Sequence, residues 1–336
     1  MPTPTVATVL ADYRALNKNE QEQVQSAILA SLFPGTNLKV YMESKRFAYG
    51  RVCPHCGSTH AVRNGKRPDG TQRFKCMDCG KRFVITTNSV VSGTRKKLSV
   101  WIAFVECMLL GLSLNESADK CGIHRNTAFA WRHKVLDALQ KLAESVNLDG
   151  IVEADETFFP LSYKGNSKGL KASAVKKRGL SNDQVCVPCA VNRSGLSIAK
   201  VANRARVKEK GLDAVLSGRI APGSNIVTDG ATAYRKFASK NGLVLHQLTG
   251  GKSASSGIYS IGHINNYHGQ LKDFMKKFKG VSTKYLNNYL IWFNYAKYKR
   301  VSLADKQEKM LTYIFTTVFY ERNCDISKRD DLPLLA

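Results

Sequence analysis

Two cysteine pairs constrain the possible folds of this chain more than any other feature of its sequence. Each pair has the spacing CxxC, and 19 residues separate the first pair from the second. The four cysteines are Cys53, Cys56, Cys76 and Cys79. Four thiolates at this spacing can surround one tetrahedral Zn²⁺, and the glycine after each pair permits a tight turn at the metal. Because few large apolar residues lie nearby, we expect a zinc ribbon that folds around a structural Zn²⁺.

The ribbon also carries two histidines and several basic residues. His55 or His60 is an alternative zinc ligand, but the symmetric spacing favours the four cysteines. The basic residues that could contact DNA phosphates are Arg63, Lys66, Arg67, Arg73 and Lys75. A zinc ribbon can serve folding alone or DNA binding as well, and we expect this one to do both.

The charge of the chain supports a polyanionic partner. Lys and Arg number 51 against 26 Asp and Glu, which gives a formal net charge of +25. Basic residues occur along the whole length, no stretch reaches the roughly 18 consecutive apolar residues of a membrane span, and the first residues lack the pattern of a secretion signal. We therefore expect a nucleic acid as partner, no membrane association, and a cytoplasmic location.

A helix-turn-helix pattern follows the ribbon. Apolar residues recur at helical spacing between residues 99 and 142, and Gly122 interrupts them at a position suited to a tight turn. Short three-helix units without DNA function show the same pattern, but the neighbouring ribbon and the positive charge favour DNA binding. The second helix would then expose four DNA-binding side chains. These are Arg125, Asn126, Arg132 and His133.

The third region alternates predicted strands and helices. Strands are expected over residues 151–159, 184–192, 196–202, 225–228 and 243–248, and helices over residues 207–216, 231–239 and 264–279. An antiparallel start of three strands followed by this alternation is the order that a ribonuclease-H-like fold requires. We therefore expect a multidomain α/β protein in which a zinc ribbon and a helix-turn-helix precede a ribonuclease-H-like mixed-sheet domain.

Acidic residues interrupt or end two of the predicted apolar strands. Asp155 interrupts the first strand of this region, and Asp229 follows the fourth strand directly before a glycine. Period-two alternation places Glu153 on the same face as Asp155 and Glu156 on the opposite face. Asp229 alone could belong to a common Asp-Gly turn. As a pair on neighbouring strands, however, Asp155 and Asp229 would offer the carboxylate oxygens that Mg²⁺ prefers.

The last predicted helix of this region supplies a third set of polar residues. Asn265, His268 and Lys272 are separated by three, four and seven positions, so they share a helix face beside the apolar stripe. Asn265 could offer its carbonyl oxygen to a metal ion, and Lys272 could hold a DNA phosphate. The alternatives are a helix N-cap for Asn265 and a solvated basic face for Lys272.

With these motifs, the chain resembles insertion-sequence transposases of the DDE superfamily, in the zinc-ribbon branch with Asn in the third catalytic position. The resemblance covers about residues 48–300. Its motifs are Asp155-Glu156-Thr157, Thr228-Asp229-Gly230, His263-x-Asn265-x-x-His268-x-x-Leu271-Lys272 and the run from Gly280 to Trp292. The resemblance implies that Asp155, Asp229 and Asn265 are ligands of catalytic Mg²⁺ or Mn²⁺, with Asn265 in the place usually held by glutamate. It also implies that Lys272 is the lysine of this signature.

The resemblance implies a reaction on double-stranded DNA as well, and a nucleoid-associated location in the cytoplasm of a prokaryotic cell. A metal-activated water would hydrolyse a strand at the terminal inverted repeat, and the freed 3′-hydroxyl would then attack the target DNA. The ribbon and helix-turn-helix would recognise the inverted repeat, and the pairing of two ends implies a homodimer or larger assembly. Since an amide is a weaker ligand than a carboxylate, His263, His268 or Glu153 would compensate for Asn265. Glu153 ranks first because its spacing places it beside Asp155.

Two rival functions are compatible with the sequence. The first is a sequence-specific DNA-binding regulator, derived from a transposase that no longer cleaves, and Asn265 keeps this alternative open. The second is a ribonuclease-H-like nuclease that acts on structured or hybrid nucleic acid. The separate ribbon and helix-turn-helix argue against the nuclease, because an enzyme that reads nucleic-acid shape does not need them.

The domain boundaries follow from these patterns. They are 1–46 for an N-terminal helical segment, 47–92 for the ribbon, 93–148 for the helix-turn-helix, 149–300 for the catalytic domain and 301–336 for a C-terminal helical tail. The first segment holds one predicted helix over residues 20–33, which would be a packing cap or a dimerisation arm. The tail from about Asp325 is expected to be poorly ordered.

Overall fold

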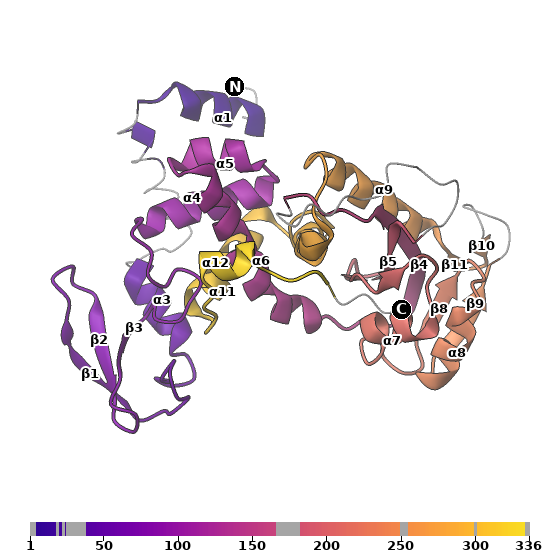
Figure 1. The fold of residues 1–336 in the computed structure, drawn as a ribbon, viewed down its shortest axis with the longest axis horizontal. Coiled ribbons are helices and arrows are strands. Elements are labelled where there is room, and N and C mark those ends of the chain that lie inside the picture. The colour runs from indigo at the N-terminus through magenta and orange to yellow at the C-terminus, as the bar shows by residue number, and fades with distance from the viewer. Residues whose placement is uncertain are drawn as a thin grey trace. The chain divides into compact units, whose positions relative to one another are not determined.

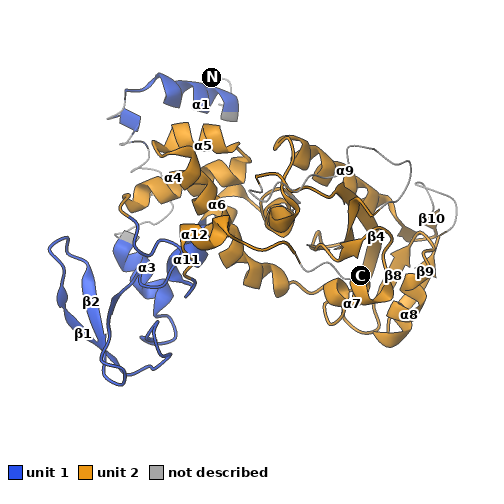
Figure 2. Ribbon diagram, in the orientation of Figure 1, with its two compact units in different colours: residues 1–94, 308–319 blue, residues 95–307, 320–336 orange. Residues whose placement is uncertain are grey.

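The computed structural model describes residues 5–17, 20, 21, 24, 38–165, 182–248, 255–298 and 301–332. The chain divides into two compact units, coloured blue and orange in Figure 2. Unit 1 consists of residues 1–94 and 308–319, and unit 2 consists of residues 95–307 and 320–336. Most of the helix expected over residues 20–33 lies outside the described residues. The five-domain division drawn from the sequence is finer than these two units and stays a prediction.

Unit 1 is built around a three-stranded antiparallel sheet in the order β1-β2-β3. The strands are β1 (Ala61–Lys66), β2 (Gln72–Cys76) and β3 (Arg82–Val84). The helices are α1 (Val6–Ala15), α3 (Leu38–Arg46) and the part of α11 (Leu303–Thr316) from residue 308 onward. The core of the sheet is aromatic, because the ring of Phe74 lies 5.1 Å from that of Phe47 and 5.4 Å from that of Phe83.

Helix α3 joins the ribbon to the returning C-terminal segment within unit 1. The hydroxyl of Tyr41 donates to the carboxylate of Glu308 at 2.9 Å and lies 2.9 Å from the hydroxyl of Thr312. At the other end of α3, the guanidinium of Arg46 donates to the backbone oxygen of Ile85, just after β3. Segments from both ends of the chain therefore complete this unit.

Three helices open unit 2. They are α4 (Leu98–Leu110), α5 (Leu114–Cys121) and α6 (Arg125–Glu144). Helices α4 and α5 end at Gly111 and Gly122, whose φ angles of 74° and 59° are left-handed, a conformation that glycine adopts without strain. The rings of Trp101 and Trp131 stack with centroids 3.7 Å apart, so α4 and α6 share a core. The helix, glycine turn and helix expected from the sequence are therefore present.

A mixed sheet forms the second part of unit 2 (Figure 1). Its strands are β4 (Ile151–Pro160), β5 (Gln184–Asn192), β6 (Ser197–Ala199), β7 (Asn203–Arg204), β8 (Asn225–Thr228) and β9 (Val244–Gln247). The order is β6-β5-β4-β8-β9, in which β5 is antiparallel to both β4 and β6, whereas β8 and β9 run parallel to β4. This is the strand order of a ribonuclease-H-like sheet, and the expected fold class is confirmed.

Different helices cover the two faces of this sheet. Helices α7 (Glu209–Leu216) and α8 (Ala233–Lys240) lie on one face, where Val152 and Ala154 of β4 share a buried core with Phe237. Helix α9 (Gly262–Lys276) lies on the other face, because Glu153, which points away from Val152 and Ala154, contacts His263. The alternation of β4 side chains between the faces agrees with the period-two prediction.

The remaining elements of unit 2 are shorter. They are the hairpin of β10 (Ser255–Ser256) and β11 (Tyr259–Ser260), a 3₁₀ turn (Thr283–Tyr285), α10 (Leu286–Trp292), a π-helical turn (Phe293–Tyr298) and α12 (Asn323–Ser327). After α12, the guanidinium of Arg329 donates to the carboxylates of Asp137 and Glu321, at 3.0 Å in each case. The expectation of a poorly ordered tail from about Asp325 is therefore wrong for residues 325–332. None of the helices in the described part of the chain combines the length and apolar character needed to cross a membrane.

Candidate active site and metal centre

The four predicted zinc ligands lie together in unit 1. Their Sγ atoms are all within 4.8 Å of one another. Cys53 Sγ is 3.8 Å from Cys79 Sγ, and Cys56 Sγ is 3.6 Å from Cys76 Sγ. In each pair, the following glycine donates its N–H to the backbone oxygen of the first cysteine, at 2.9 and 3.0 Å. These paired turns gather the four thiols as a structural zinc site requires.

The two histidines named as alternative ligands do not join this cluster. His60 Nδ1 lies 3.2 Å from a carboxylate oxygen of Asp78, and His55 approaches Cys53 Sγ only through its backbone N–H, at 3.4 Å. Within the described residues, the four cysteines are the only group of three or more Cys, His, Asp or Glu side chains close enough to hold one metal ion. The structure gathers the four cysteines and neither histidine, and their role as zinc ligands stays a prediction.

The basic residues predicted for the ribbon differ in exposure. Arg63, Lys66 and Arg67 are exposed, whereas Arg73 and Lys75 are half-buried. The difference follows from the sheet order, because β2 is the central strand and is flanked on both sides. The exposed members of the predicted set therefore lie on β1 and at the start of the turn that follows it.

Helix α6 exposes only the first two of its four predicted DNA-binding residues. Arg125 and Asn126 are exposed, but Arg132 is 1% exposed and His133 is fully buried. The prediction that α6 exposes Arg132 and His133 is therefore wrong. The cause is α10, which packs on this side of α6 and brings Asn288 Nδ2 to 3.1 Å from His133 Nδ1.

The buried part of α6 makes polar contacts within the protein. The guanidinium of Arg132 donates to the backbone oxygen of Leu112 at 2.8 Å and lies 4.5 Å from the ring centroid of Trp292. Burial lowers the pKa of His133 to about 3, so this imidazole is neutral at physiological pH. Both residues thus hold α6 against α10.

Asp155 and Asp229 occupy neighbouring positions, one within β4 and the other directly after the parallel strand β8. Glu153 of β4 is opposite Val227 of β8, and each aspartate follows two residues later in the chain. Burial raises the pKa of Asp155 to about 6, and the nearby charge of Asp229 contributes to this increase. Asp229 is exposed, and its carboxylate accepts the N–H of Ala231 at 3.2 Å. The structure therefore brings the two predicted aspartates together where the parallel pairing of β4 with β8 ends.

Helix α9 presents the remaining predicted residues to this pair. His268 Nδ1 lies 3.6 Å from Asp155 Oδ2, and Asn265 is half-buried one turn earlier on the helix. Burial lowers the pKa of His268 to about 4, with a smaller contribution from the charge of Lys272. Lys272 itself is exposed one turn beyond His268.

Asn265 is not a helix N-cap. Helix α9 begins at Gly262, and the N–H of Asn265 already donates to the backbone oxygen of Ile261 at 3.1 Å. The N-cap alternative considered for Asn265 is therefore wrong, because this residue lies inside the first turn. Its side chain is on the helix that faces Asp155.

Glu153 has a different environment from the one expected. It shares a strand face with Asp155, as predicted, but it is 1% exposed and its two carboxylate oxygens are engaged. One oxygen accepts the N–H groups of His263 and Ile264 at 2.7 and 3.0 Å, and the other lies 3.1 Å from the guanidinium of Arg193. These contacts make Glu153 a cap for α9 rather than an available metal ligand.

Glu156 lies on the opposite face of the sheet, as the period-two alternation predicts. Burial raises the pKa of Glu156 to about 7, and the side chain interacts with Tyr234 of α8. The sheet thus separates Glu156 from Asp155, although the two residues are adjacent in the chain.

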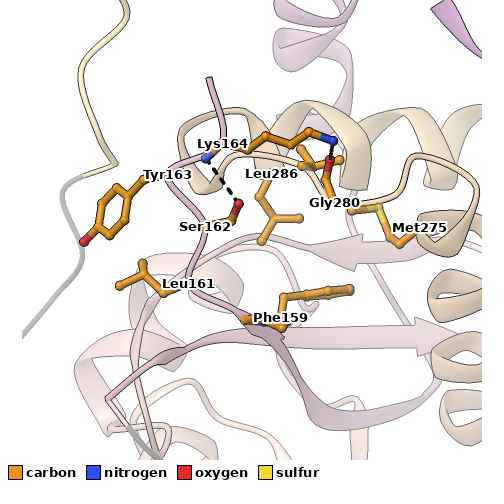
Figure 3. Close-up of a pocket in the computed structure, with 10 residues that line it drawn as sticks. Phe159, Leu161, Ser162, Tyr163, Lys164, Met275, Gly280 and Leu286 are labelled. Carbon is orange, nitrogen blue, oxygen red and sulfur yellow. Dashed lines mark hydrogen bonds between the residues drawn. The ribbon is translucent and has the colours of Figure 1, made fainter. Parts of the chain in front are cut away.

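A cavity of about 550 Å³ lies where β4 ends, beside the C-terminal end of α9 (Figure 3). Phe159 and Met275 contribute to its mainly apolar lining. At its rim, Lys164 Nζ donates to the backbone oxygens of Lys279 and Gly280 at 3.0 and 3.2 Å, the second of which Figure 3 draws. The chain that continues from β4 therefore holds the C-terminal end of α9.

Comparisons with known proteins agree with both sites. Residues 147–297 match a family model described as ISXO2-like transposase domain, and residues 38–82 match one described as transposase zinc-ribbon domain. The first match contains both aspartates and α9, and the second contains the four cysteines. Two segments of the chain are therefore similar to a transposase domain and to a transposase zinc ribbon.

Two individual proteins show more limited similarity. The chain is 44% identical over 34 residues to the insertion element iso-IS1N protein InsA of Shigella dysenteriae, a match that spans 10% of this chain and 38% of InsA. It aligns with a chain in the crystal structure of a pre-cleavage Mos1 transpososome at 11% identity and a TM-score of 0.21, over 91% of this chain and 100% of that chain. The second similarity is too low for a comparison of folds.

Proposed function

We propose that this chain is a DNA transposase that binds the terminal inverted repeats of an insertion sequence and catalyses metal-dependent strand cleavage and strand transfer. The observation that carries the proposal is the adjacency of Asp155, within β4, and Asp229, directly after the parallel strand β8, inside the segment that matches a transposase domain. Sites of α/β sheets form at the carboxyl ends of parallel strands, where side chains from separate strands converge.

Asp155, Asp229 and the carbonyl oxygen of Asn265 would hold catalytic Mg²⁺ or Mn²⁺. Two neighbouring carboxylates fit a divalent cation, because the raised pKa of Asp155 reflects burial and repulsion that a cation would relieve. When bound, such ions activate the attacking water or 3′-hydroxyl and neutralise charge that develops on the phosphate. Asn265 contributes no charge, so the proposed site relies on the two aspartates for electrostatic attraction.

His268 and Lys272 would assist from the same face of α9. His268 is neutral at physiological pH because of its lowered pKa, so it can direct an N–H at Asp155 without competing with a cation. Lys272 is exposed and carries a positive charge one turn further on, where it would bind a phosphate of the DNA end. In this proposal His268 orients a ligand and Lys272 positions the substrate.

DNA recognition is assigned to the exposed basic residues of the ribbon and to Arg125 and Asn126 at the start of α6. Side chains at the beginning of a recognition helix reach base edges in the major groove, whereas the ribbon would contact mainly phosphates. Arg132 and His133 are left out of this surface because they are buried. Since transposition pairs two ends, we propose that the active species is a dimer or larger assembly on prokaryotic nucleoid DNA.

Strand cleavage and joining on DNA that carries the element's own ends tests the proposal. Wild type is compared with Asp155→Ala, Asp229→Ala and Asn265→Ala in Mg²⁺ or Mn²⁺. Asp273→Asn is the matched control, because it removes an exposed carboxylate from the same helix. We expect wild type and the control to cut and join, and the three alanine variants to bind DNA without doing either. Sequence-specific binding by wild type without any cleavage would instead favour the transposase-derived regulator.

A further inference from the structure

Helix α9 has no N-cap of its own. The residue at its N-cap position is Ile261, which provides no side-chain hydrogen bond to the first turn. The N–H groups of a first turn need acceptors from elsewhere, and an anionic acceptor also interacts favourably with the helix dipole. The start of α9 therefore depends on a group from another part of the fold.

Glu153 supplies that group from strand β4, 110 positions earlier in the chain than His263. Its carboxylate accepts the N–H groups of His263 and Ile264 at 2.7 and 3.0 Å, and the second oxygen lies 2.9 Å from His263 Nδ1. The next residue along α9 is Asn265. The contact therefore fixes the backbone directly before the proposed third ligand.

Arg193 balances the charge of this buried carboxylate. Its guanidinium lies 3.1 Å from Glu153 Oε1 and 2.7 Å from His263 Nδ1, and it donates to the backbone oxygen of Ile258 at 3.1 Å. A buried carboxylate is tolerated when several donors and an opposite charge surround it. Arg193 thus supplies the opposite charge beside the buried carboxylate of Glu153.

Strand β4 and the chain that follows it hold α9 at three points. Glu153 binds its first turn, Asp155 faces His268 in its middle, and Lys164, beyond the end of β4, donates to the backbone after its last turn. The helix is therefore aligned along the strand that carries Asp155. A displacement of its first turn would move Asn265 relative to that aspartate.

We propose that Glu153, supported by Arg193, is a positioning residue that sets Asn265 against the two catalytic aspartates. Glu153 does not touch the metal or the substrate. Because Asn265 offers a single neutral oxygen, its contribution depends on exact placement more than that of a charged ligand would. This inference rests on the proposed role of Asn265, and it replaces the expectation that Glu153 itself completes the metal site.

The test compares Glu153→Ala and Glu153→Gln with wild type, with Asp273→Asn as the control. The first measurement is amide hydrogen exchange of residues 263–265 in protein free of metal and DNA. We expect exchange to accelerate about tenfold or more in Glu153→Ala, because the buried acceptor is lost. Glu153→Gln should accelerate it less, because the amide oxygen can still accept one N–H. Unchanged exchange in Glu153→Ala would overturn the proposal.

The second measurement is direct Mn²⁺ binding, followed by electron paramagnetic resonance. Loss of a residue that orients a ligand typically weakens metal binding about 10-fold to 100-fold, and we expect about tenfold for Glu153→Ala with partial rescue by Glu153→Gln. Equal losses in both variants without any change in exchange would make Glu153 a direct ligand and refute the positioning role. If Glu153→Ala does not fold, Glu153→Gln and Arg193→Gln are measured instead, with smaller increases of exchange expected at the same amides.

These measurements separate the inference from the proposed function. A wild type that binds Mn²⁺ but never cleaves the element's DNA ends contradicts the transposase proposal, whereas the exchange and Mn²⁺ results still decide the role of Glu153. Conversely, if wild type is active and exchange is unchanged in Glu153→Ala, the transposase proposal stands and the positioning role of Glu153 is refuted.

Discussion

Nδ1 of His268 lies 3.6 Å from Oδ2 of Asp155, and burial perturbs the two side chains in opposite directions. The pKa of Asp155 rises from 3.8 to about 6, whereas the pKa of His268 falls from 6.5 to about 4. Between these shifted values both groups are neutral in the folded metal-free protein. Their contact there is a polar contact rather than an ion pair.

The opposite pKa shifts of Asp155 and His268 predict that Asp155→Asn and His268→Gln change the pH dependence of stability in opposite directions. The raised pKa of Asp155 contributes stability that is present below pH 3.8 and lost as the pH rises through about 6. The lowered pKa of His268 contributes stability that is present above pH 6.5 and lost as the pH falls through about 4. Relative to metal-free wild type, the free energy of unfolding should fall with rising pH in His268→Gln and rise in Asp155→Asn, by up to about 3 kcal/mol across the window. Denaturant titrations measure both trends, and curves parallel to wild type would contradict the assignment.

Removal of zinc should unfold the ribbon and leave the mixed sheet intact. Folding of a small ribbon is coupled to metal binding, and its four thiols lie within 4.8 Å of one another in the fold. A chelator or Cys76→Ser should therefore expose residues 53–85 to proteolysis and abolish tight binding to the DNA ends. Proteolysis followed by mass spectrometry locates the cleavage sites. Cys324→Ser is the control, since this exposed cysteine lies outside the cluster, and a protease-resistant ribbon without metal would refute the prediction.

Arg132 and Arg125 of the same helix should respond differently to truncation. Arg132→Ala removes a buried side chain that packs on Trp292, and it should lower the free energy of unfolding by about 2–4 kcal/mol. Arg125→Ala removes an exposed residue, and it should leave stability unchanged while reducing the salt dependence of DNA binding by about one unit of log–log slope. Thermal unfolding and binding titrations at several salt concentrations distinguish the two. If Arg132→Ala kept its stability and reduced the salt dependence of DNA binding, Arg132 would have to be counted among the residues that contact DNA.

The C-terminal contact of Arg329 should contribute to the stability of unit 2. Its guanidinium bridges the partly buried carboxylates of Asp137 and Glu321, so Arg329→Gln should cost about 1–3 kcal/mol of unfolding free energy. Arg322→Gln is a suitable comparison, because it breaks an exposed pair with Asp325 and should cost less than about 1 kcal/mol. Equal losses of unfolding free energy for the two substitutions in denaturant titrations would show that the contact of Arg329 stabilises the protein no more than an exposed ion pair does.

Local patterns in the sequence predicted the elements of the sheet domain well. The strands over residues 184–192 and 225–228 have the predicted bounds, because their apolar runs end abruptly at polar or glycine-containing segments. The pairing of Asp155 and Asp229 was also predictable, since each follows the same kind of run and parallel neighbours bring such ends together. The spacing of the cysteines was sufficient for the metal centre.

Contacts between distant segments account for what the sequence did not reveal. Arg132 and His133 follow the polar pattern of an exposed recognition helix, and only α10, about 155 positions later, buries them. Glu153 has the right spacing for a metal ligand, but its partner is the uncapped start of α9. In both cases the spacing of the polar residue along its own helix or strand predicted the correct face. Local spacing does not predict which distant element packs on that face.

The contact of Tyr41 with Glu308 and Thr312 has a consequence for biosynthesis. Ribosomes deliver the ribbon early, but the helix that completes unit 1 emerges only after the whole mixed sheet has been translated. The nascent ribbon therefore waits, with its α3 surface uncovered, until residues 308–319 leave the exit tunnel. A polypeptide that stops short of them carries the four ribbon cysteines and both aspartates yet cannot close its first unit, so completion of the ribbon unit is timed by the synthesis of the sheet domain.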